Sequence, residues 1–269
     1  MVILALDTTT KAGSCALWRD GALLEQRPGD AARTHAERLP GDLADLLAAH
    51  GLTVKDVDLY AVASGPGSFT GLRVGIATIQ GLALVHDRKV VAVSALEALA
   101  QCGAAAVEGA TVVGGWMEAY RKEVFGALYR ITARGPAGAL ATLEELAAPA
   151  VASPADLAAA WASIIKSEGK EGTGGEAVII GDAVPSTRDA LIAALPPTAP
   201  VSASASASAS AVHLLDTVPL AATIAQIAHA HPERATLPHA IIPLYVRRPD
   251  AELARDRRER GEPHPVVPA

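Results

Sequence analysis

The stretch "SGPGSFTGLR", residues 64–73, lies between an apolar run at 57–63, typical of a buried strand, and a weakly charged run from Phe69 to about His86 that predicts a helix. Such a loop can hold a phosphate, or it can simply turn a strand sharply into a helix. It contains no P-loop lysine, and Thr70 stands where a dinucleotide fingerprint needs its last glycine. Because helix starts bind anions in general, a phosphate role stays open.

The glycines continue into the predicted helix with a regular spacing. Gly67, Gly71 and Gly75 recur every four residues, and the last two share a helix face with Thr78. A glycine inside a helix costs about 1 kcal/mol relative to alanine, so this spacing indicates a packing benefit. We expect close approach of another element, either within the subunit or from a partner.

The amino-acid composition limits which classes of protein this sequence can belong to. Of 269 residues 50% are hydrophobic and only 3% aromatic, which predicts a folded core of small aliphatic side chains. The net charge of −6 argues against strong binding of nucleic acid by this chain alone. Cys15 and Cys102 stand apart, as free thiols would. With neither a long apolar span nor a leader at its start, we expect a cytoplasmic protein without membrane contact.

The first hundred residues predict an α/β unit. Residues 2–6 and 14–26 indicate three antiparallel strands with a hairpin turn at Asp20-Gly21. A capping box, Thr34-x-x-Glu37, starts an amphipathic helix that ends at Gly51. A strand at 89–93 and a helix from Ser94 follow, the helix with a second box that Glu97 would complete.

The rest of the chain predicts a second α/β unit less clearly. Strand candidates occupy 111–117 and 123–131, and a helix-like segment covers 214–230. Residues 166–176 and 202–210 are low-complexity sequence and predict linkers, of which the second should be dispensable.

Together, "MVILALDTTT", "THAERLP", "SGPGSFTGLRVGIATIQGLAL", "VAVSALEALA", "WMEAYRKEVF" and "PLYVRRPDAE" closely resemble the TsaB (YeaZ) family. The resemblance is dense up to about residue 130, thin through the middle, and returns at 243–252. It implies the α/β fold of the actin, sugar-kinase and heat-shock ATPase (ASKHA) superfamily, with two related subdomains, each a mixed sheet with helices. We expect them at 1–103 and 104–248, followed by a flexible tail at 249–269.

The resemblance also implies a role in making N6-threonylcarbamoyladenosine in tRNA, next to the anticodon. In this family TsaB is a non-catalytic platform for the transferase TsaD, with TsaE as an ATPase partner and TsaC as the source of threonylcarbamoyl-adenylate. ATP and Mg²⁺ would be used by the complex, which would also contact the tRNA, while this chain would hold no tight cofactor. Alone, the chain could form a homodimer.

The residues agree with a non-catalytic role. TsaD-like proteins bind their metal through a His-x-x-x-His pair, and the matching positions here are Ala95 and Leu99. We therefore expect no catalytic residues and no metal, and a peptidase activity is excluded on the same ground. His35 and Glu37 are also set aside as an acid/base pair, because capping explains Glu37 and leaves His35 on an exposed turn. The run "MEAYRKEVF" departs from the family's usual Met-Asp-Ala-Arg, with Glu118 and Tyr120 at the changed positions.

A vestigial nucleotide site is predicted where the superfamily's first phosphate hairpin would lie. Glycine is missing there until Gly13, so the hairpin residues could instead satisfy a turn. The residues assigned to this site are Asp7, Thr8, Thr9, Ser64, Gly65 and Gly67.

The leading hypothesis is an interaction subunit that packs two helices, 39–49 and 70–84, against TsaD. Its predicted interface comprises Leu39, Leu43, Leu46, Thr70, Gly71, Arg73, Val74, Gly75, Thr78 and Leu82. Gly75→Leu should then leave the subunit folded and weaken partner binding. The alternative is a freestanding ATP-dependent small-molecule kinase that uses Asp7 and the 64–68 loop.

Overall fold

The computed structural model describes residues 1–136, 138–168, 176–195 and 211–247. The predicted tail at 249–269 and the repeat at 202–210 lie outside these residues, as does most of the 166–176 segment. In the part of the chain that the structure describes, none of the helices has the length and apolar character needed to cross a bilayer.

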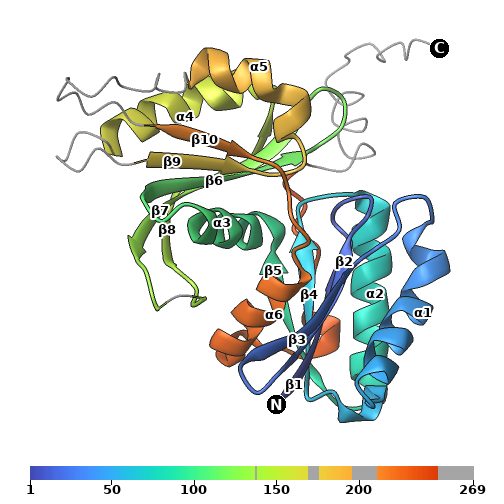
Figure 1. The fold of residues 1–269 in the computed structure, drawn as a ribbon. Helices are drawn as coiled ribbons and strands as arrows, with labels where there is room; N and C mark the ends of the chain where they lie inside the picture. The colour runs from blue at the N-terminus through green and yellow to red at the C-terminus, as the bar shows by residue number, and fades with distance from the viewer. Residues whose placement is uncertain (137, 169–175, 196–210, 248–269) are drawn as a thin grey trace, which may run out of the picture.

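The first sheet has the strand order β3-β2-β1-β4-β5, and its helices cover both faces (Figure 1). Strand β1 pairs antiparallel with β2 and parallel with β4, so the predicted opening strands are confirmed. Asp20 and Gly21 both have positive φ in the hairpin turn. The strands are β1 Val2–Asp7, β2 Ser14–Arg19, β3 Ala22–Pro28, β4 Leu59–Gly65 and β5 Lys89–Ser94.

Side chains at alternate positions of these strands point to opposite faces of the sheet, and each face contributes to a separate hydrophobic core. Leu4, Leu6 and Leu17 pack under α1 (His35–Ala49) and α2 (Phe69–Val85), which follow the predicted helices closely. The opposite face packs against α6 (Ala221–Ala230) and α3 (Ala95–Ala106). A short 3-10 helix, η1 (Val54–Asp56), precedes β4.

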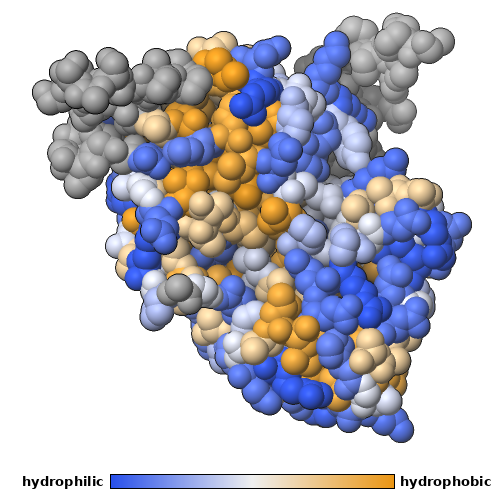
Figure 2. All heavy atoms as spheres, in the orientation of Figure 1, coloured by the Kyte–Doolittle hydropathy of each residue, from blue (hydrophilic) through white to orange (hydrophobic). Residues whose placement is uncertain are grey.

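The second sheet has the order β10-β9-β6-β7-β8, with α3 on the face toward the first sheet and α4 and α5 on the other (Figure 1). Hydrophobic residues gather around its β9 and β10 edge in Figure 2, where every residue of β10 is half-buried. These elements are β6 Ala110–Glu118, β7 Val124–Ala133, β8 Thr142–Ala152, β9 Glu176–Ile180, β10 Val212–Leu215, α4 Pro154–Glu168 and α5 Val184–Ala194.

After β10 the chain returns to the first sheet. The predicted helix at 214–230 is shorter than expected, because Leu214 and Leu215 belong to β10 and α6 begins only at Ala221. Two 3-10 turns follow, η2 (Pro232–Arg234) and η3 (Pro238–Ala240), and the Leu244 N–H then donates to the Ser64 carbonyl at 2.7 Å. Residues assigned by sequence to the second subdomain thus complete the packing of the first sheet, while the division at residue 103 itself stays a prediction.

Candidate functional site

The 64–73 loop turns β4 into α2 and caps the helix. Gly65 and Gly67 have φ of +114° and +157°, values that favour glycine. The Ser68 N–H donates to the Thr9 carbonyl at 2.8 Å, and the Ser68 hydroxyl accepts from the Gly71 N–H at 3.2 Å. The loop therefore joins the end of β1 to the start of α2.

The small face of α2 packs within the subunit. A Cβ placed on Gly75 would overlap the Thr8 hydroxyl and lie 2.9 Å from its methyl carbon, and one on Gly71 would overlap the Thr8 carbonyl. This corrects the prediction for Gly75→Leu, since a bulky residue would disturb the fold itself. The close approach that the glycine spacing indicated is to the β1–β2 loop.

Part of the predicted partner interface is wrong for the same reason. Leu39, Leu43 and Leu46 are at most 2% exposed in the subunit's own core, so they cannot also contact a partner in this conformation. Of the remaining predicted residues on α2, Thr70 and Arg73 are exposed, whereas Val74, Thr78 and Leu82 are half-buried. Whether these five contact a partner stays a prediction.

Instead, α2 presents an exposed face with a different composition. Arg73 is the one charged residue among its 17. Its guanidinium lies 3.8 Å from the centre of the Phe69 ring and donates to the Tyr245 hydroxyl at 3.1 Å. Further along the helix the exposed residues are small or apolar: Ala77, Gly81, Leu84 and Val85. We call this set, with Phe69 and Arg73, the α2 face.

The residues predicted to hold a nucleotide come together around the ends of β1 and β4. The Asp7 carboxylate accepts from the Thr9 N–H at 2.9 Å and from its hydroxyl at 2.6 Å, and burial raises the pKa of Asp7. A Cβ on Gly67 would lie 2.5 Å from the Thr9 carbonyl oxygen, and one on Gly65 would lie 3.0 Å from that of Leu244. Both glycines therefore lie directly against the protein's own backbone, and whether these residues hold a nucleotide stays a prediction.

The metal positions are apolar in space as well as in sequence. Ala95 and Leu99 are buried in α3, at most 1% exposed, and the described residues contain no cluster of three metal-ligating side chains. The second capping box is only half formed. Ser94 accepts from the Glu97 N–H, but the Glu97 carboxylate pairs with both terminal nitrogens of Arg234 at 2.8 and 3.0 Å.

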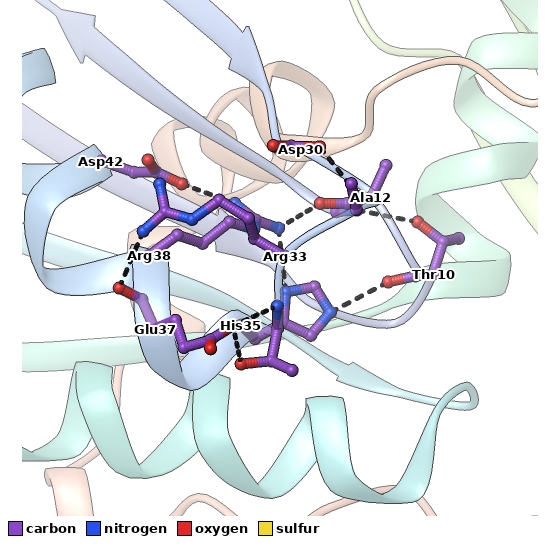
Figure 3. Close-up of polar contacts among 11 residues, drawn as sticks. Thr10, Ala12, Asp30, Arg33, His35, Glu37, Arg38 and Asp42 are labelled. Atoms are coloured by element: carbon purple, nitrogen blue, oxygen red, sulfur yellow. Dashed lines mark hydrogen bonds and ion pairs between the residues drawn. The ribbon is translucent and has the colours of Figure 1, made fainter.

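A buried arginine, which the sequence reasoning missed, organises the start of α1 (Figure 3). Arg38 is 4% exposed; it pairs with Asp42 at 2.6 Å and donates to the Ala12 carbonyl and to His35 Nδ1. His35 in turn donates from Nε2 to the Thr10 carbonyl at 3.1 Å. Its ring is thus half-buried rather than exposed, and burial, with the Arg38 charge, lowers the pKa of His35. The i, i+4 spacing of Arg38 and Asp42 was the sequence signal that could have revealed the role of this arginine.

The chain is similar to known proteins over most of its length. The family model for TsaD, tRNA N6-adenosine threonylcarbamoyltransferase, matches residues 24–255. A YeaZ structure from Pseudomonas aeruginosa superposes with a TM-score of 0.66 at 28% identity, over 91% of this chain and 99% of that one. The fold and the match to the family model together show that the chain is an ASKHA-like protein of the class that the TsaD model describes.

Two bacterial relatives indicate to which family of this class the chain belongs. The chain is 41% identical over 133 residues to the Escherichia coli "tRNA threonylcarbamoyladenosine biosynthesis protein TsaB", and 37% identical over 155 residues to the Haemophilus influenzae protein of the same name. These alignments cover 48% and 57% of this chain. The chain spans only 55% and 65% of the length of those relatives. It belongs to the TsaB (YeaZ) family.

Proposed function

We propose that this chain is an accessory subunit for the formation of N6-threonylcarbamoyladenosine in tRNA, and that it binds the transferase TsaD and performs no chemistry itself. The names of the curated relatives support the pathway. The apolar residues at the positions of the metal histidines support the absence of catalysis. In this proposal the complex works in the cytoplasm, TsaE joins it, and ATP, Mg²⁺ and tRNA are bound by the complex.

The α2 face is the observation that carries the proposal. A single charge in a 17-residue helix with an exposed side is unusual for a surface in contact with water, and contiguous apolar surface marks protein interfaces. The Phe69, Arg73 and Tyr245 cluster at one end has the residue types that dominate interface energetics. The small residues Ala77 and Gly81 would let a partner helix approach closely. In the absence of TsaD, the same face would pair two copies of this chain.

A charge placed on this face tests the proposal. Ala77→Glu puts a carboxylate at an exposed alanine in the middle of the α2 face, and Ala159→Glu does the same on α4, beside the second sheet. We expect Ala77→Glu to weaken binding to the cognate TsaD at least about tenfold, because burying an unpaired charge is costly. Ala159→Glu should bind as the wild type does. Titration calorimetry measures both, and an assay of tRNA modification with each subunit omitted measures the functional consequence.

Two results would contradict the proposal. Equal binding by Ala77→Glu and the wild type would mean that the α2 face is not the interface. Turnover of ATP by the isolated chain would favour the small-molecule kinase of the same superfamily instead.

A further inference from the structure

The α2 face carries one charge, and that charge has no acid beside it. Arg73 is exposed and is the one charged residue of α2. Three other arginines around the first sheet, Arg27, Arg38 and Arg234, each pair with a carboxylate. Among the residues that the structure describes, no carboxylate pairs with Arg73. This arginine therefore differs from its neighbours in having a charge that the subunit leaves uncompensated.

Two aromatic residues hold the Arg73 side chain in position. The guanidinium lies 3.8 Å from the centre of the Phe69 ring, one turn earlier on α2, and its Nε donates to the Tyr245 hydroxyl at 3.1 Å. The centres of the two rings are 5.5 Å apart, so Phe69 and Tyr245 form one continuous support. A side chain that is already positioned loses less entropy when a partner binds it.

The terminal nitrogens of Arg73 are left for a partner. Tyr245 occupies Nε, and no described residue accepts a hydrogen bond from either terminal nitrogen. These two nitrogens form the fork that matches the two oxygens of a carboxylate. A phosphate has similar geometry, but the rest of the α2 face is small or apolar and offers an RNA backbone no second cation. The surroundings therefore favour a protein carboxylate.

Covering the α2 face makes such an acid necessary. A partner that lies on this face removes water from Arg73, and a buried charge without a counter-charge is costly. A symmetric pair of subunits presents the same surface on both sides. Because α2 contains neither aspartate nor glutamate, two copies that pair through this helix place Arg73 against no carboxylate of α2. A different protein with an acid at this point is then preferred over a second copy.

We propose that Arg73 binds a carboxylate on the surface of TsaD, and that this ion pair makes the α2 face select TsaD over a second copy of the chain. The inference rests on the proposed function and adds the chemistry of the partner surface. That surface is small or apolar, and it carries one aspartate or glutamate that meets the terminal nitrogens of Arg73. Phe69 and Tyr245 orient the arginine for this contact.

Titration calorimetry of the full chain with the cognate TsaD tests the ion pair. Arg73→Met keeps an unbranched apolar side chain and removes the charge, so it should weaken binding at least about tenfold by leaving the acid of TsaD unpaired. Arg73→Lys keeps the charge without the fork and should lie between Arg73→Met and the wild type. Arg188→Met removes an exposed arginine of α5 and should change the affinity less than about twofold. Self-association, measured by sedimentation, should not weaken in Arg73→Met.

A charge reversal identifies the acid. Arg73→Glu should lose binding, and replacing one exposed aspartate or glutamate of TsaD by arginine should restore it. The inference is overturned if Arg73→Met binds TsaD as tightly as the wild type while Ala77→Glu does not, and that result leaves the proposed function intact. It is also overturned if no reversal in TsaD rescues Arg73→Glu, or if Arg73→Met weakens self-association as much as it weakens TsaD binding. Unchanged binding by both Arg73→Met and Ala77→Glu would overturn the α2 interface itself.

Discussion

The glycines of α2 have very different surroundings, although they lie on one helix. Gly75 faces the buried Thr8 so closely that no side chain fits, whereas a Cβ on Gly81 would meet no atom within 4 Å. Glycine weakens a helix wherever it occurs; close packing offsets that loss at Gly75, as it does at Gly71, but not at Gly81. The two positions should therefore respond to substitution in opposite directions.

Gly75→Ala should lower the free energy of unfolding by about 1–3 kcal/mol, because the added methyl group overpacks the contact with Thr8. Gly81→Ala should raise it by about 0.5–1 kcal/mol through helix propensity alone. Urea denaturation of the two variants and the wild type measures both values. If Gly75→Ala were more stable than the wild type, the β1–β2 loop would have to move readily to accommodate the added methyl group.

Asp7 should make stability depend on pH in a defined sense. Burial raises its pKa in the folded state above the ordinary value of 3.8, so the folded chain binds the proton more tightly than the unfolded chain does. Stability from this group therefore falls as the pH rises from the unfolded pKa through the folded pKa. In Asp7→Asn the amide oxygen still accepts from Thr9 but carries no charge.

Asp7→Asn should accordingly be more stable than the wild type at pH 7, and this advantage should shrink as the pH is lowered toward 4. Thermal unfolding of both proteins across this range measures the difference. An advantage that does not change with pH would mean that Asp7 titrates normally in the folded protein.

At the scale of elements, α1 and α3 begin with the same signature but use its glutamate differently. Glu37 folds back onto Thr34, as a capping box requires. Glu97 instead reaches Arg234 in η2, which also donates to the Ala92 carbonyl. The second glutamate thus links the start of α3 and the end of β5 to the segment that follows α6.

Glu97→Gln should lower the free energy of unfolding by about 1 kcal/mol, because it removes a bidentate ion pair that is only partly exposed. Glu37→Gln should have a smaller effect, since the amide oxygen can still accept from Thr34. Urea denaturation compares them, and a double-mutant cycle with Arg234→Gln isolates the pair. Additive effects in that cycle would contradict the coupling.

At the scale of the whole molecule, the segment after α6 connects the two sheets. Its Thr236 pairs with Val90 of β5, and Leu244 donates to Ser64 at the end of β4. Arg247 then donates to the Ala119 carbonyl at 2.7 Å, pairs with Glu123 and lies over Phe125 of β7. One segment thereby holds the β6–β7 turn of the second sheet in place from the first.

Arg247→Ala should free this turn, whose residues Tyr120, Arg121 and Lys122 all have positive φ. We expect trypsin to cut after Arg121 or Lys122 several times faster than in the wild type, because local opening governs cleavage. Arg130→Ala removes another arginine of the second sheet, paired with Glu144 and Glu168, and should leave this site unchanged. Mass spectrometry of timed digests identifies the cuts. Identical rates would show that Arg247 does not restrain the turn.

Local sequence determined much of the first half of the fold. Turn chemistry at Asp20-Gly21, the Thr34 box and the alternation of apolar residues act between near neighbours, so the strands and α1 and α2 could be predicted from them. Strand β8 and helices α4 and α5 were not predicted. Their runs of alanine carry little periodic contrast, and contacts with Trp116, Trp161 and β7 stabilise them.

In the candidate site, the difference between what the sequence determines and what the tertiary structure decides is sharper still. The sequence by itself determined that α2 carries closely spaced glycines and almost no charge, and that the metal histidines are missing. Only the tertiary structure decided that Gly75 packs on Thr8, that Leu39 is core, and that Tyr245 contacts Arg73. A small or apolar residue favours close packing whichever neighbour supplies it, so its partner depends on chain topology rather than on residues nearby in sequence.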